Sequence, residues 1–237
     1  MRILSVLWKI YGGLVLGIVI ALFYPVHFIL LSHRPWFPVA FRLMRFQSFV
    51  ILTLIGIVSR VKFEGKLPNG PFIICPNHTS YIDILVMYRI FKRYFVFMGK
   101  MELAEMPLLN LFFKRMNVLV DRNSTMASVR ALQATSAEID KGHSVVIFPE
   151  GTIPKSAPKM KSFKNGPFKL AIEKQVPIVP VTFLNNYKLL QIGAFFRQNG
   201  RPGVARVIVN ETISTKGMTD KDLIPLRQQV FEVIERT

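Results

Sequence analysis

PFIICPNHTSYIDILVMYRIFK, residues 71–92, contains an apolar run, a short polar turn and a second apolar stretch. The run PFIIC (71–75) is short and rich in β-branched and aromatic residues, which is typical of a buried strand. The stretch SYIDILVMYRIFK (80–92) has apolar residues at helical spacing. His78 and Asp83 lie five positions apart where the two elements meet. The segment therefore predicts a strand–turn–helix unit with polar side chains at the carboxyl end of the strand.

The same alternation of strands and helices continues along the chain. Five further segments are predicted as strands: residues 93–99, 117–121, 144–149, 177–184 and 205–211. Further helices are predicted at residues 124–142, 165–175 and 219–236, with Ser124 as the N-cap of the first and a Thr-x-x-Asp capping box opening the last. Near-continuous apolar strands that alternate with helices indicate an α/β domain whose sheet is covered on both faces. We predict a single such domain over residues 61–237.

Residues 1–60 differ from the rest of the chain in charge and hydropathy. All 14 acidic residues lie at Glu64 or later, and residues 10–31 contain no formally charged side chain. That section is long enough for a bilayer-spanning helix, which needs about 20 residues. A second apolar stretch, residues 49–58, is too short to span alone. We predict an N-terminal membrane anchor of two helices, which either crosses the bilayer or inserts into one leaflet. The alternative is a secretory signal peptide, but the apolar section exceeds the roughly 7–15 residues of a signal core and no cleavage site is evident.

Composition indicates a lipid partner. The 237-residue chain has a net charge of +17, is 51% hydrophobic and contains 20 phenylalanines. Strong positive charge favours either nucleic acid or an anionic membrane surface. The apolar N-terminus favours the membrane surface, and we predict no nucleic-acid partner. The single cysteine excludes an intramolecular disulfide and a multi-cysteine metal site. We predict neither a metal nor a cofactor.

His78 and Asp83 have two interpretations. In the first, Ser80 and Asp83 form a capping box, and the carboxylate only satisfies backbone donors. In the second, Asp83 hydrogen-bonds one ring nitrogen of His78 and makes the other a base for a hydroxyl proton. The chain has no Gly-x-Ser-x-Gly motif, and Cys75 is predicted to be a buried, inert thiol. Without a protein nucleophile the substrate must supply the hydroxyl, so the second interpretation predicts group transfer to an alcohol.

Other polar residues follow other predicted strands, at the ends where ligands bind in open α/β sheets. These residues are Lys100, Asp121, Arg122, Glu150, Gly151 and Thr152. Lys100 and Arg122 are either ordinary surface charges or phosphate ligands. Backbone N–H groups around Gly151 are expected to offer an anion-binding nest. Five lysines and no acid lie between residues 151 and 172. This lysine-rich loop is either simply solvated or a lip over the site that contacts anionic headgroups or the phosphates of an acyl carrier.

Four motifs together resemble the 1-acylglycerol-3-phosphate O-acyltransferase family, the glycerolipid acyltransferases that make phosphatidic acid. NHTSYID (77–83) matches the family's His-x4-Asp motif, and FPEGT (148–152) matches its third motif. MNVLVDR (116–122) is similar to the second motif, and VPIVPV (176–181) matches the fourth. The resemblance covers residues 64–185. It implies a glycerol-3-phosphate acyltransferase-like fold with a mixed, largely parallel sheet. It also implies an anchor in the inner, cytoplasmic membrane with the catalytic domain on the cytoplasmic side.

The resemblance also implies a reaction. His78, oriented by Asp83, would deprotonate the sn-2 hydroxyl of lysophosphatidate. That oxygen would attack the thioester of acyl-CoA or acyl carrier protein without an acyl-enzyme, giving phosphatidic acid for phospholipid biosynthesis. Arg122 and Lys100 would hold the phosphate. Positioning of the acceptor is implied for Glu150, Gly151 and Thr152.

Two positions depart from the family's pattern. Met116 stands where the second motif has Gly, and Ile153 stands where Arg or Ser follows FPEGT. The missing Arg removes one phosphate contact, for which Lys155 is the expected replacement. The acceptor therefore stays open between lysophosphatidate and a lyso-ornithine lipid, another lysophospholipid or glycerol 3-phosphate. A different class of function is a non-enzymatic basic module that docks on anionic membranes, in which His78 has no chemical role.

Overall fold

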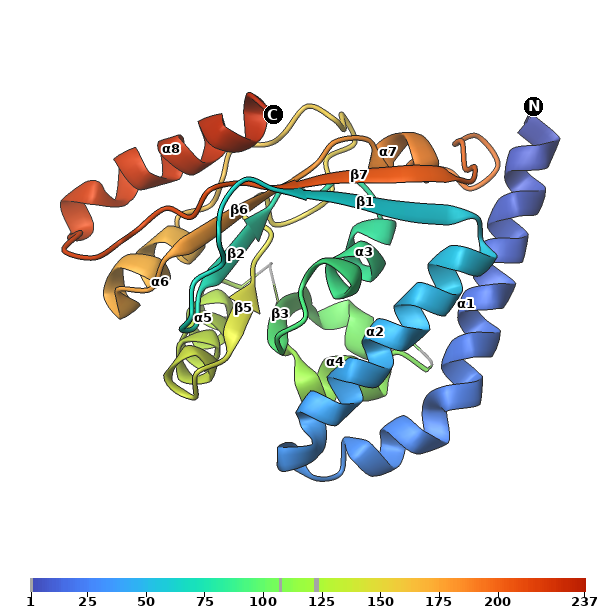
Figure 1. The fold of residues 1–237 in the computed structure, drawn as a ribbon, viewed down its shortest axis with the longest axis horizontal. Coiled ribbons are helices and arrows are strands. Elements are labelled where there is room, and N and C mark those ends of the chain that lie inside the picture. The colour runs from blue at the N-terminus through green and yellow to red at the C-terminus, as the bar shows by residue number, and fades with distance from the viewer. Residues whose placement is uncertain (1, 107, 122–123) are drawn as a thin grey trace.

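The computed structural model describes residues 2–106, 108–121 and 124–237, and these form a seven-stranded sheet flanked by helices (Figure 1). The strands are β1 (Ile57–Phe63), β2 (Ile73–Pro76), β3 (Phe95–Lys100), β4 (Val118–Val120), β5 (Ser144–Val146), β6 (Ile178–Phe183) and β7 (Gly203–Val209). The helices are α1 (Arg2–Leu30), α2 (Phe37–Leu54), α3 (Ile82–Ile90), α4 (Asn110–Met116), α5 (Thr125–Asp140), α6 (Gly166–Lys174), α7 (Asn186–Leu189) and α8 (Leu223–Glu235). Short 3-10 helices lie at Arg34–Trp36, Met101–Ala104 and Asp220–Asp222.

The sheet is mixed and largely parallel, as predicted. Its strand order is β1-β7-β6-β2-β5-β3-β4, and only the β6–β7 pair among these neighbours is antiparallel. β2 lies in the middle of this order and pairs in parallel with both β5 and β6. The carboxyl ends of these three strands therefore meet at one edge of the sheet. At this edge His78 follows β2 and Glu150 follows β5.

The core has two layers, one on each face of the sheet. Successive residues of a strand point to opposite faces, and Ile73, Ile74 and Cys75 of β2 are all fully buried. Ile73 and Cys75 pack with apolar residues of α5, α6 and α8, whereas Ile74 packs with residues of α2 and α3. Figure 1 shows these two groups of helices on opposite sides of the sheet. Burial on both faces explains why the central strands are apolar almost throughout.

The structure contains every predicted strand and helix of the domain, with bounds that differ by up to a few residues. Both hydrogen bonds of the predicted Thr219–Asp222 capping box are present, and Ser124 accepts the N–H of Ala127 as the N-cap of α5. The sequence pattern missed β1, because its first residues, Ile57 and Val58, continue the apolar run of residues 49–58. The predicted division at residue 60 falls inside this strand. The short helices α4 and α7 were also missed.

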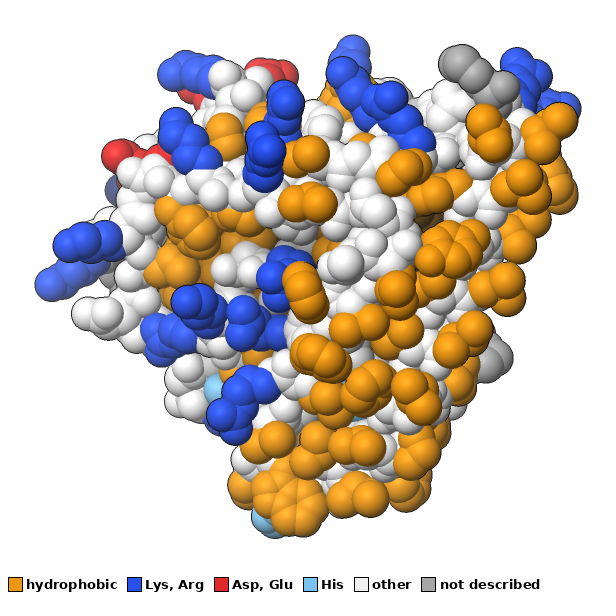
Figure 2. All heavy atoms as spheres, turned by 45° about the vertical axis from the view of Figure 1, so that its right-hand side comes forward, with side chains coloured by type: hydrophobic (Ala, Val, Ile, Leu, Met, Phe, Trp, Pro, Cys, Tyr) orange, Lys and Arg blue, Asp and Glu red, His pale blue; other side chains and the backbone are white. Residues whose placement is uncertain are grey.

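α1 and α2 form a hairpin along one side of the domain (Figure 1). By length and composition alone, both are long and apolar enough to cross a membrane. Several of their polar side chains face inward, since Ser5, Lys9, His27 and Gln47 are buried. Exposed apolar residues of α1 include Ile3, Leu4, Leu7, Leu14, Ile18 and Leu22. Figure 2 shows hydrophobic side chains gathered over this side of the molecule. An exposed apolar surface of this kind is the pattern expected of helices that lie against another apolar surface.

Candidate active site

His78 and Asp83 form a hydrogen-bonded pair at the carboxyl end of β2. Nδ1 of His78 lies 2.9 Å from Oδ2 of Asp83. His78 is in the turn after β2, and Asp83 is in the first turn of α3. The spacing of five residues lets the start of the helix direct the carboxylate back to the ring. The Asp83 side chain is fully buried, whereas 13% of the His78 side chain is exposed.

Hydrogen-bond donors surround the Asp83 carboxylate. Oδ2 also accepts from the backbone N–H groups of Thr79 at 2.6 Å and Ser80 at 2.9 Å. Oδ1 accepts from Nδ2 of Asn186 at 2.7 Å. Because every one of these neighbours donates, the pattern fits a carboxylate and leaves no acceptor for a carboxyl proton. Nδ1 of His78 therefore carries a hydrogen and donates it to Asp83, which leaves Nε2 with a lone pair and makes it the basic nitrogen.

Asp83 makes the hydrogen bonds that each of its two interpretations expects, one to the backbone of Ser80 and one to the ring of His78. The carboxylate satisfies the Ser80 N–H, as in a capping box, and it also holds His78. Ser80 Oγ donates to the carbonyl oxygen of Leu190 at 2.7 Å, which ties the turn to the segment after α7. One carboxylate thus fixes both the start of α3 and the orientation of the imidazole.

Phe148 and Asn77 hold the His78 ring and its turn in place. The Phe148 ring stacks on the imidazole, with centroids 3.9 Å apart and planes inclined by 24°. Asn77 Oδ1 accepts the N–H of Phe183 at 2.7 Å, and its Nδ2 donates to the carbonyl of the same residue at 3.2 Å. The turn is thereby fastened to β6.

Glu150 joins the His78 turn to the lysine-rich loop. Oε1 accepts the backbone N–H of His78 at 2.8 Å, and Oε2 accepts that of Lys161 at 2.9 Å. Glu150 is buried. Burial raises the pKa of Glu150 above its usual range, and the two backbone hydrogen bonds oppose that effect without cancelling it. Through its two hydrogen bonds, Glu150 connects the turn of His78 to the backbone of Lys161.

The raised pKa of Glu150 predicts how stability changes with pH. The folded protein keeps a proton on Glu150 above the pH at which the unfolded chain loses it. This stabilising contribution is present below the ordinary glutamate pKa and is lost as pH rises through the raised value. In denaturant unfolding, the wild type is expected to lose stability over that interval relative to Glu150→Gln, which cannot titrate. A difference between the two proteins that stays constant across the interval would contradict the shift.

A cavity of about 550 Å³ lies beside Glu150. Its lining residues are Lys100, Glu150, Gly151, Thr152, Lys161, Ser162, Phe163 and Lys164. Lys100 pairs with Glu102 at 2.6 Å. Lys161 and Lys164 form no ion pair with any carboxylate in the described part of the chain. Lys155, the expected replacement for the missing Arg, is not among the lining residues. Three lysines around one cavity make it suited to an anionic group.

Gly151 brings the Lys164 side chain to this cavity. Its φ of +73° is a backbone conformation that favours glycine. A Cβ atom at this position would lie 2.9 Å from Cε of Lys164, so the lysine passes directly over the glycine. The Gly151 N–H donates to the carbonyl oxygen of Phe148 at 3.0 Å. This N–H closes a turn, and the Lys164 side chain adds positive charge beside it, whereas anion binding by the backbone N–H groups around Gly151 stays a prediction.

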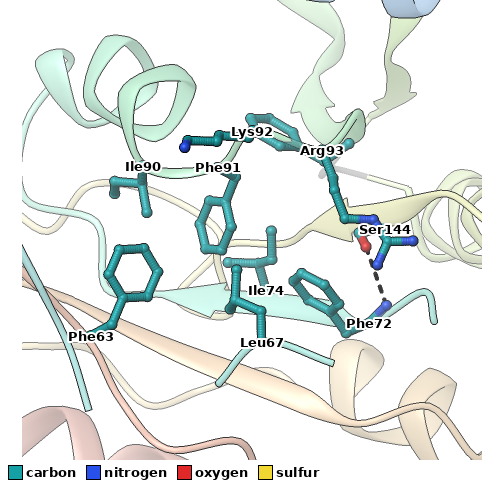
Figure 3. A pocket seen from close by; sticks show the side chains of 10 residues that line it. Phe63, Leu67, Phe72, Ile74, Ile90, Phe91, Lys92, Arg93 and Ser144 are labelled. Atoms are coloured by element: carbon teal, nitrogen blue, oxygen red, sulfur yellow. Dashed lines mark hydrogen bonds between the residues drawn. The ribbon is translucent and has the colours of Figure 1, made fainter. Parts of the chain in front are cut away.

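A smaller, apolar cavity of about 320 Å³ lies at the opposite ends of the strands (Figure 3). Phe72, which precedes β2, lines it together with Phe95 at the start of β3 and Ser144 at the start of β5. The N–H of Phe72 donates to Oγ of Ser144 at 3.3 Å. Because His78 lies beyond the other end of β2, this cavity is separate from the site around His78.

The described residues offer His78 no nucleophile. Burial in β2 raises the pKa of the Cys75 thiol, which confirms the prediction of an inert cysteine. Nε2 of His78 hydrogen-bonds to no hydroxyl or thiol in the described ranges. His143 has a partner of its own: its Nδ1 lies 2.8 Å from Oε2 of Glu138, and its ring packs edge-on against Tyr94. It precedes β5, at the amino-terminal ends of the parallel strands, whereas His78 lies at their carboxyl ends.

Several residues of the site were not identified from the sequence. Asn186 lies 103 positions beyond Asp83, and only the fold brings them together. Phe148 was part of a recognised motif but had no expected role. The sequence identified Lys161 and Lys164 only as two of the five lysines in the lysine-rich loop and predicted no separate role for them. Arg122 lies outside the described residues, so its predicted phosphate contact stays a prediction.

Comparisons with known proteins identify the family. The family model named Acyltransferase matches residues 59–184, which include the His78–Asp83 pair and Glu150. The chain is 31% identical over 180 residues to the 1-acyl-sn-glycerol-3-phosphate acyltransferase of Saccharomyces cerevisiae, covering 74% of this chain and 57% of the yeast protein. It is 30% identical over 126 residues to the Helicobacter pylori protein of the same name, covering 53% of each. The crystal structure of PlsC, the 1-acyl-sn-glycerophosphate (LPA) acyltransferase of Thermotoga maritima, matches with a TM-score of 0.80 and 25% identity, covering 100% of this chain and 95% of that one.

The extent of these matches differs. The chain spans about half to three fifths of the length of curated relatives from a nematode, an alga and yeast. The likeness to PlsC extends over the whole chain and so includes α1 and α2. The family match runs from β1 to the end of β6 and covers more than half of the sequence. The chain therefore belongs to the acyltransferase family.

Proposed function

We propose that this protein is a membrane-bound acyltransferase that transfers a fatty acyl group from acyl-CoA or acyl carrier protein to the sn-2 hydroxyl of 1-acylglycerol 3-phosphate. The observation that carries the proposal is the His78–Asp83 pair, in which Nε2 is basic and has no hydroxyl or thiol partner in the described part of the chain. The names of its relatives support this acceptor. The product is phosphatidic acid, and the pathway is phospholipid biosynthesis.

The geometry supports direct transfer. Nε2 of His78 takes the proton of the acceptor hydroxyl as that oxygen attacks the carbonyl carbon of the thioester. The new C–O bond forms, the C–S bond breaks, and His78 returns the proton to the leaving thiolate. Asp83 holds the Nδ1 hydrogen and faces the transient imidazolium with its negative charge. No acyl-enzyme forms, in keeping with a site whose described residues lack a nucleophile.

The acceptor phosphate binds in the cavity beside Glu150. Lys161 and Lys164 supply positive charge in place of the Arg that the family's pattern has after FPEGT and that Ile153 replaces here. Lys100 lines the same cavity, and the resemblance adds Arg122. Thr152, also in the lining, positions the acceptor. Because Glu150 bonds the backbones of both His78 and Lys161, the phosphate and the reacting hydroxyl are held at a fixed separation.

α1 and α2 seat the protein in one leaflet of the inner, cytoplasmic membrane, with the catalytic domain on the cytoplasmic side. Near the amino-terminal end of α1, Lys9 donates to the carbonyl oxygen of Gln198 at 2.6 Å. Near the other end, the His27 ring packs edge-on against Phe112 of α4. These residues are about 27 Å apart along the helix at its usual rise. A helix that contacts the domain at both ends lies along its surface, which supports insertion into one leaflet over crossing.

The test is an acyl-transfer assay in mixed micelles with oleoyl-lysophosphatidate as acceptor. Acyl-CoA and acyl carrier protein thioesters are supplied separately, so the better donor is identified. Phosphatidic acid formation supports the proposal. Product from a lyso-ornithine lipid, another lysophospholipid or glycerol 3-phosphate, but not from lysophosphatidate, would keep the chemistry and replace the acceptor. Failure with every acceptor would favour the basic membrane-docking module.

Lys164→Ala is expected to raise the KM for lysophosphatidate roughly tenfold or more, because a hydrogen bond to a charged group contributes about 1.5–3 kcal/mol. The change in kcat should be smaller, since the contact exists in both ground and transition states. Lys155→Ala is the matched control, because it removes an exposed lysine of the same loop outside the cavity. Equal effects of the two substitutions would point to the overall charge of the loop and contradict a defined phosphate site.

A further inference from the structure

A loop between α7 and β7, residues 191–202, is fastened to the amino-terminal part of α1 by a buried lysine. Lys9 is only 8% exposed. Its ammonium donates to the carbonyl oxygens of Phe195 and Gln198 and lies 4.7 Å from the centroid of the Phe195 ring. A buried ammonium needs acceptors in place of water. The loop backbone supplies them, so the loop and the helix are held together.

Gly200 makes the second contact between this loop and α1. Its N–H donates to Oγ of Ser5 at 2.6 Å. A Cβ atom on Gly200 would lie 2.7 Å from Cγ of Lys9 and 2.9 Å from Cε3 of Trp8, so the backbone packs directly on the helix. Trp8 in turn donates to the carbonyl oxygen of Ile55 at 2.9 Å. The position of the loop is therefore fixed relative to both helices of the anchor.

The tip of the loop exposes two adjacent aromatic rings and two cations. Phe195 is 46% exposed and Phe196 is 74% exposed. Arg197 and Arg201 are exposed in the same loop, and residues 174–210 contain no acid. The neighbouring turns of α1 expose apolar residues as well: Ile3, Leu4 and Leu7. Aromatic rings beside basic residues are the composition of a segment at the boundary between acyl chains and headgroups.

We propose that the Phe195–Phe196 tip is a second membrane contact, which enters the headgroup region of an anionic leaflet beside the amino-terminal end of α1. The rings reach the boundary with the acyl chains, and Arg197 and Arg201 bind lipid phosphates. The inference rests on the membrane seat proposed for α1 and α2 and is independent of the chemistry of His78. A contact from the α/β domain itself fixes the tilt of the domain on the membrane.

A bilayer fits this surface better than a protein partner does. The tip is tied to a helix whose outer side chains are apolar along its length, so both lie against the same partner. An anionic bilayer accepts the rings and the unopposed positive charge together. Binding of a protein to the tip would not depend on the charge of the lipid.

The experiment uses cysteine labelling of the full chain. Cys75 is fully buried, so a dye that responds to water, such as NBD, reacts only with an introduced surface cysteine. The variants are Phe196→Cys at the tip, Leu14→Cys on α1 and Ile224→Cys on α8, and the latter two positions are 60% and 51% exposed. Figure 1 places α8 on the side of the molecule away from α1. With phosphatidylcholine vesicles that contain phosphatidylglycerol, we expect blue-shifted, brighter emission at residues 196 and 14 and no change at residue 224.

Emission at residue 196 that stays unchanged while residue 14 responds would overturn the proposal and leave the anchor intact. No response at either position would overturn it together with the membrane seat. The Arg197→Gln/Arg201→Gln variant should bind the anionic vesicles at least roughly tenfold more weakly than the wild type. Its binding to vesicles of phosphatidylcholine alone should change little. Equal binding by this variant and the wild type would overturn the phosphate contacts. Transfer to micellar lysophosphatidate should persist in Phe196→Cys, which separates a failure here from a failure of the proposed reaction.

Discussion

The His78→Ala variant is expected to lose kcat/KM for acyl transfer by roughly 10²–10⁴-fold, because the substitution removes the group that takes the hydroxyl proton. The fold should persist, since the bond from this position to Glu150 uses the backbone N–H. Formation of phosphatidic acid is measured for both proteins with the better donor, and denaturant unfolding is measured alongside. The amide of a His78→Gln variant can still donate a hydrogen bond to Asp83 but cannot take the hydroxyl proton. This variant should therefore be inactive as well, because the reaction depends on the base and not on the hydrogen bond.

His143 offers a matched control for this prediction. Its Nδ1 lies 2.8 Å from a carboxylate oxygen of Glu138, which is also five positions away. The pair lies just before β5, at the edge of the sheet away from His78. His143→Ala removes the same kind of contact without touching the site, so it should leave kcat/KM unchanged. Full activity in both alanine variants would mean that His78 is not the base and that the reaction class is wrong.

The features that could be predicted from the sequence are local ones. β2, β5 and β6 are buried on both faces, so each is a short apolar run that stands out from its neighbours. His78 and Asp83 are close in sequence and flank a strand–helix junction, so their contact follows from the geometry of one turn. β1 could not be separated from the anchor, because its residues follow an apolar helix and its partner is β7, near the other end of the chain.

The missed features depend on tertiary contacts. Asn186 donates to Asp83 only because β6 lies beside β2. The lysine-rich loop offers five lysines, and nothing in their spacing distinguishes them. In the structure, Glu150 accepts the N–H of Lys161, and the Gly151 turn makes room for Lys164. These two contacts place Lys161 and Lys164 in the lining of the cavity, whereas Lys155, which lies next to the motif, is not among the lining residues.

Asp83→Asn is expected to lower kcat/KM by up to about 10⁴-fold, as a reversed imidazole tautomer does in a triad. An amide carries no charge to face the imidazolium, and its NH2 group can turn toward Nδ1 and leave Nε2 protonated. Stability should fall by about 1–3 kcal/mol, because an amide has a single acceptor atom where the carboxylate serves Thr79, Ser80 and Asn186. Activity and denaturant unfolding are measured on the same preparations.

Asn186→Ala separates the loss of stability from the loss of charge. This substitution removes the donor to Oδ1 of Asp83 and keeps the carboxylate. The free energy of unfolding should fall by a similar amount, about 1–3 kcal/mol, while kcat/KM should fall far less than in Asp83→Asn. An equal loss of activity in the two variants would mean that a disturbed turn, and not the missing charge, slows the reaction.

Combining Asp83→Asn with His78→Ala tests whether Asp83 works through the imidazole. If its role is to orient Nδ1 and stabilise the imidazolium, then once the ring is gone the carboxylate has nothing left to contribute to the reaction. The double variant should then be no slower than His78→Ala alone, since residues that act as a unit are strongly non-additive. Losses that multiply would instead give Asp83 a separate role, such as holding the turn through its bonds to Thr79 and Ser80. The mechanism requires the first outcome, because Asp83 is fully buried and can reach the substrate only through His78.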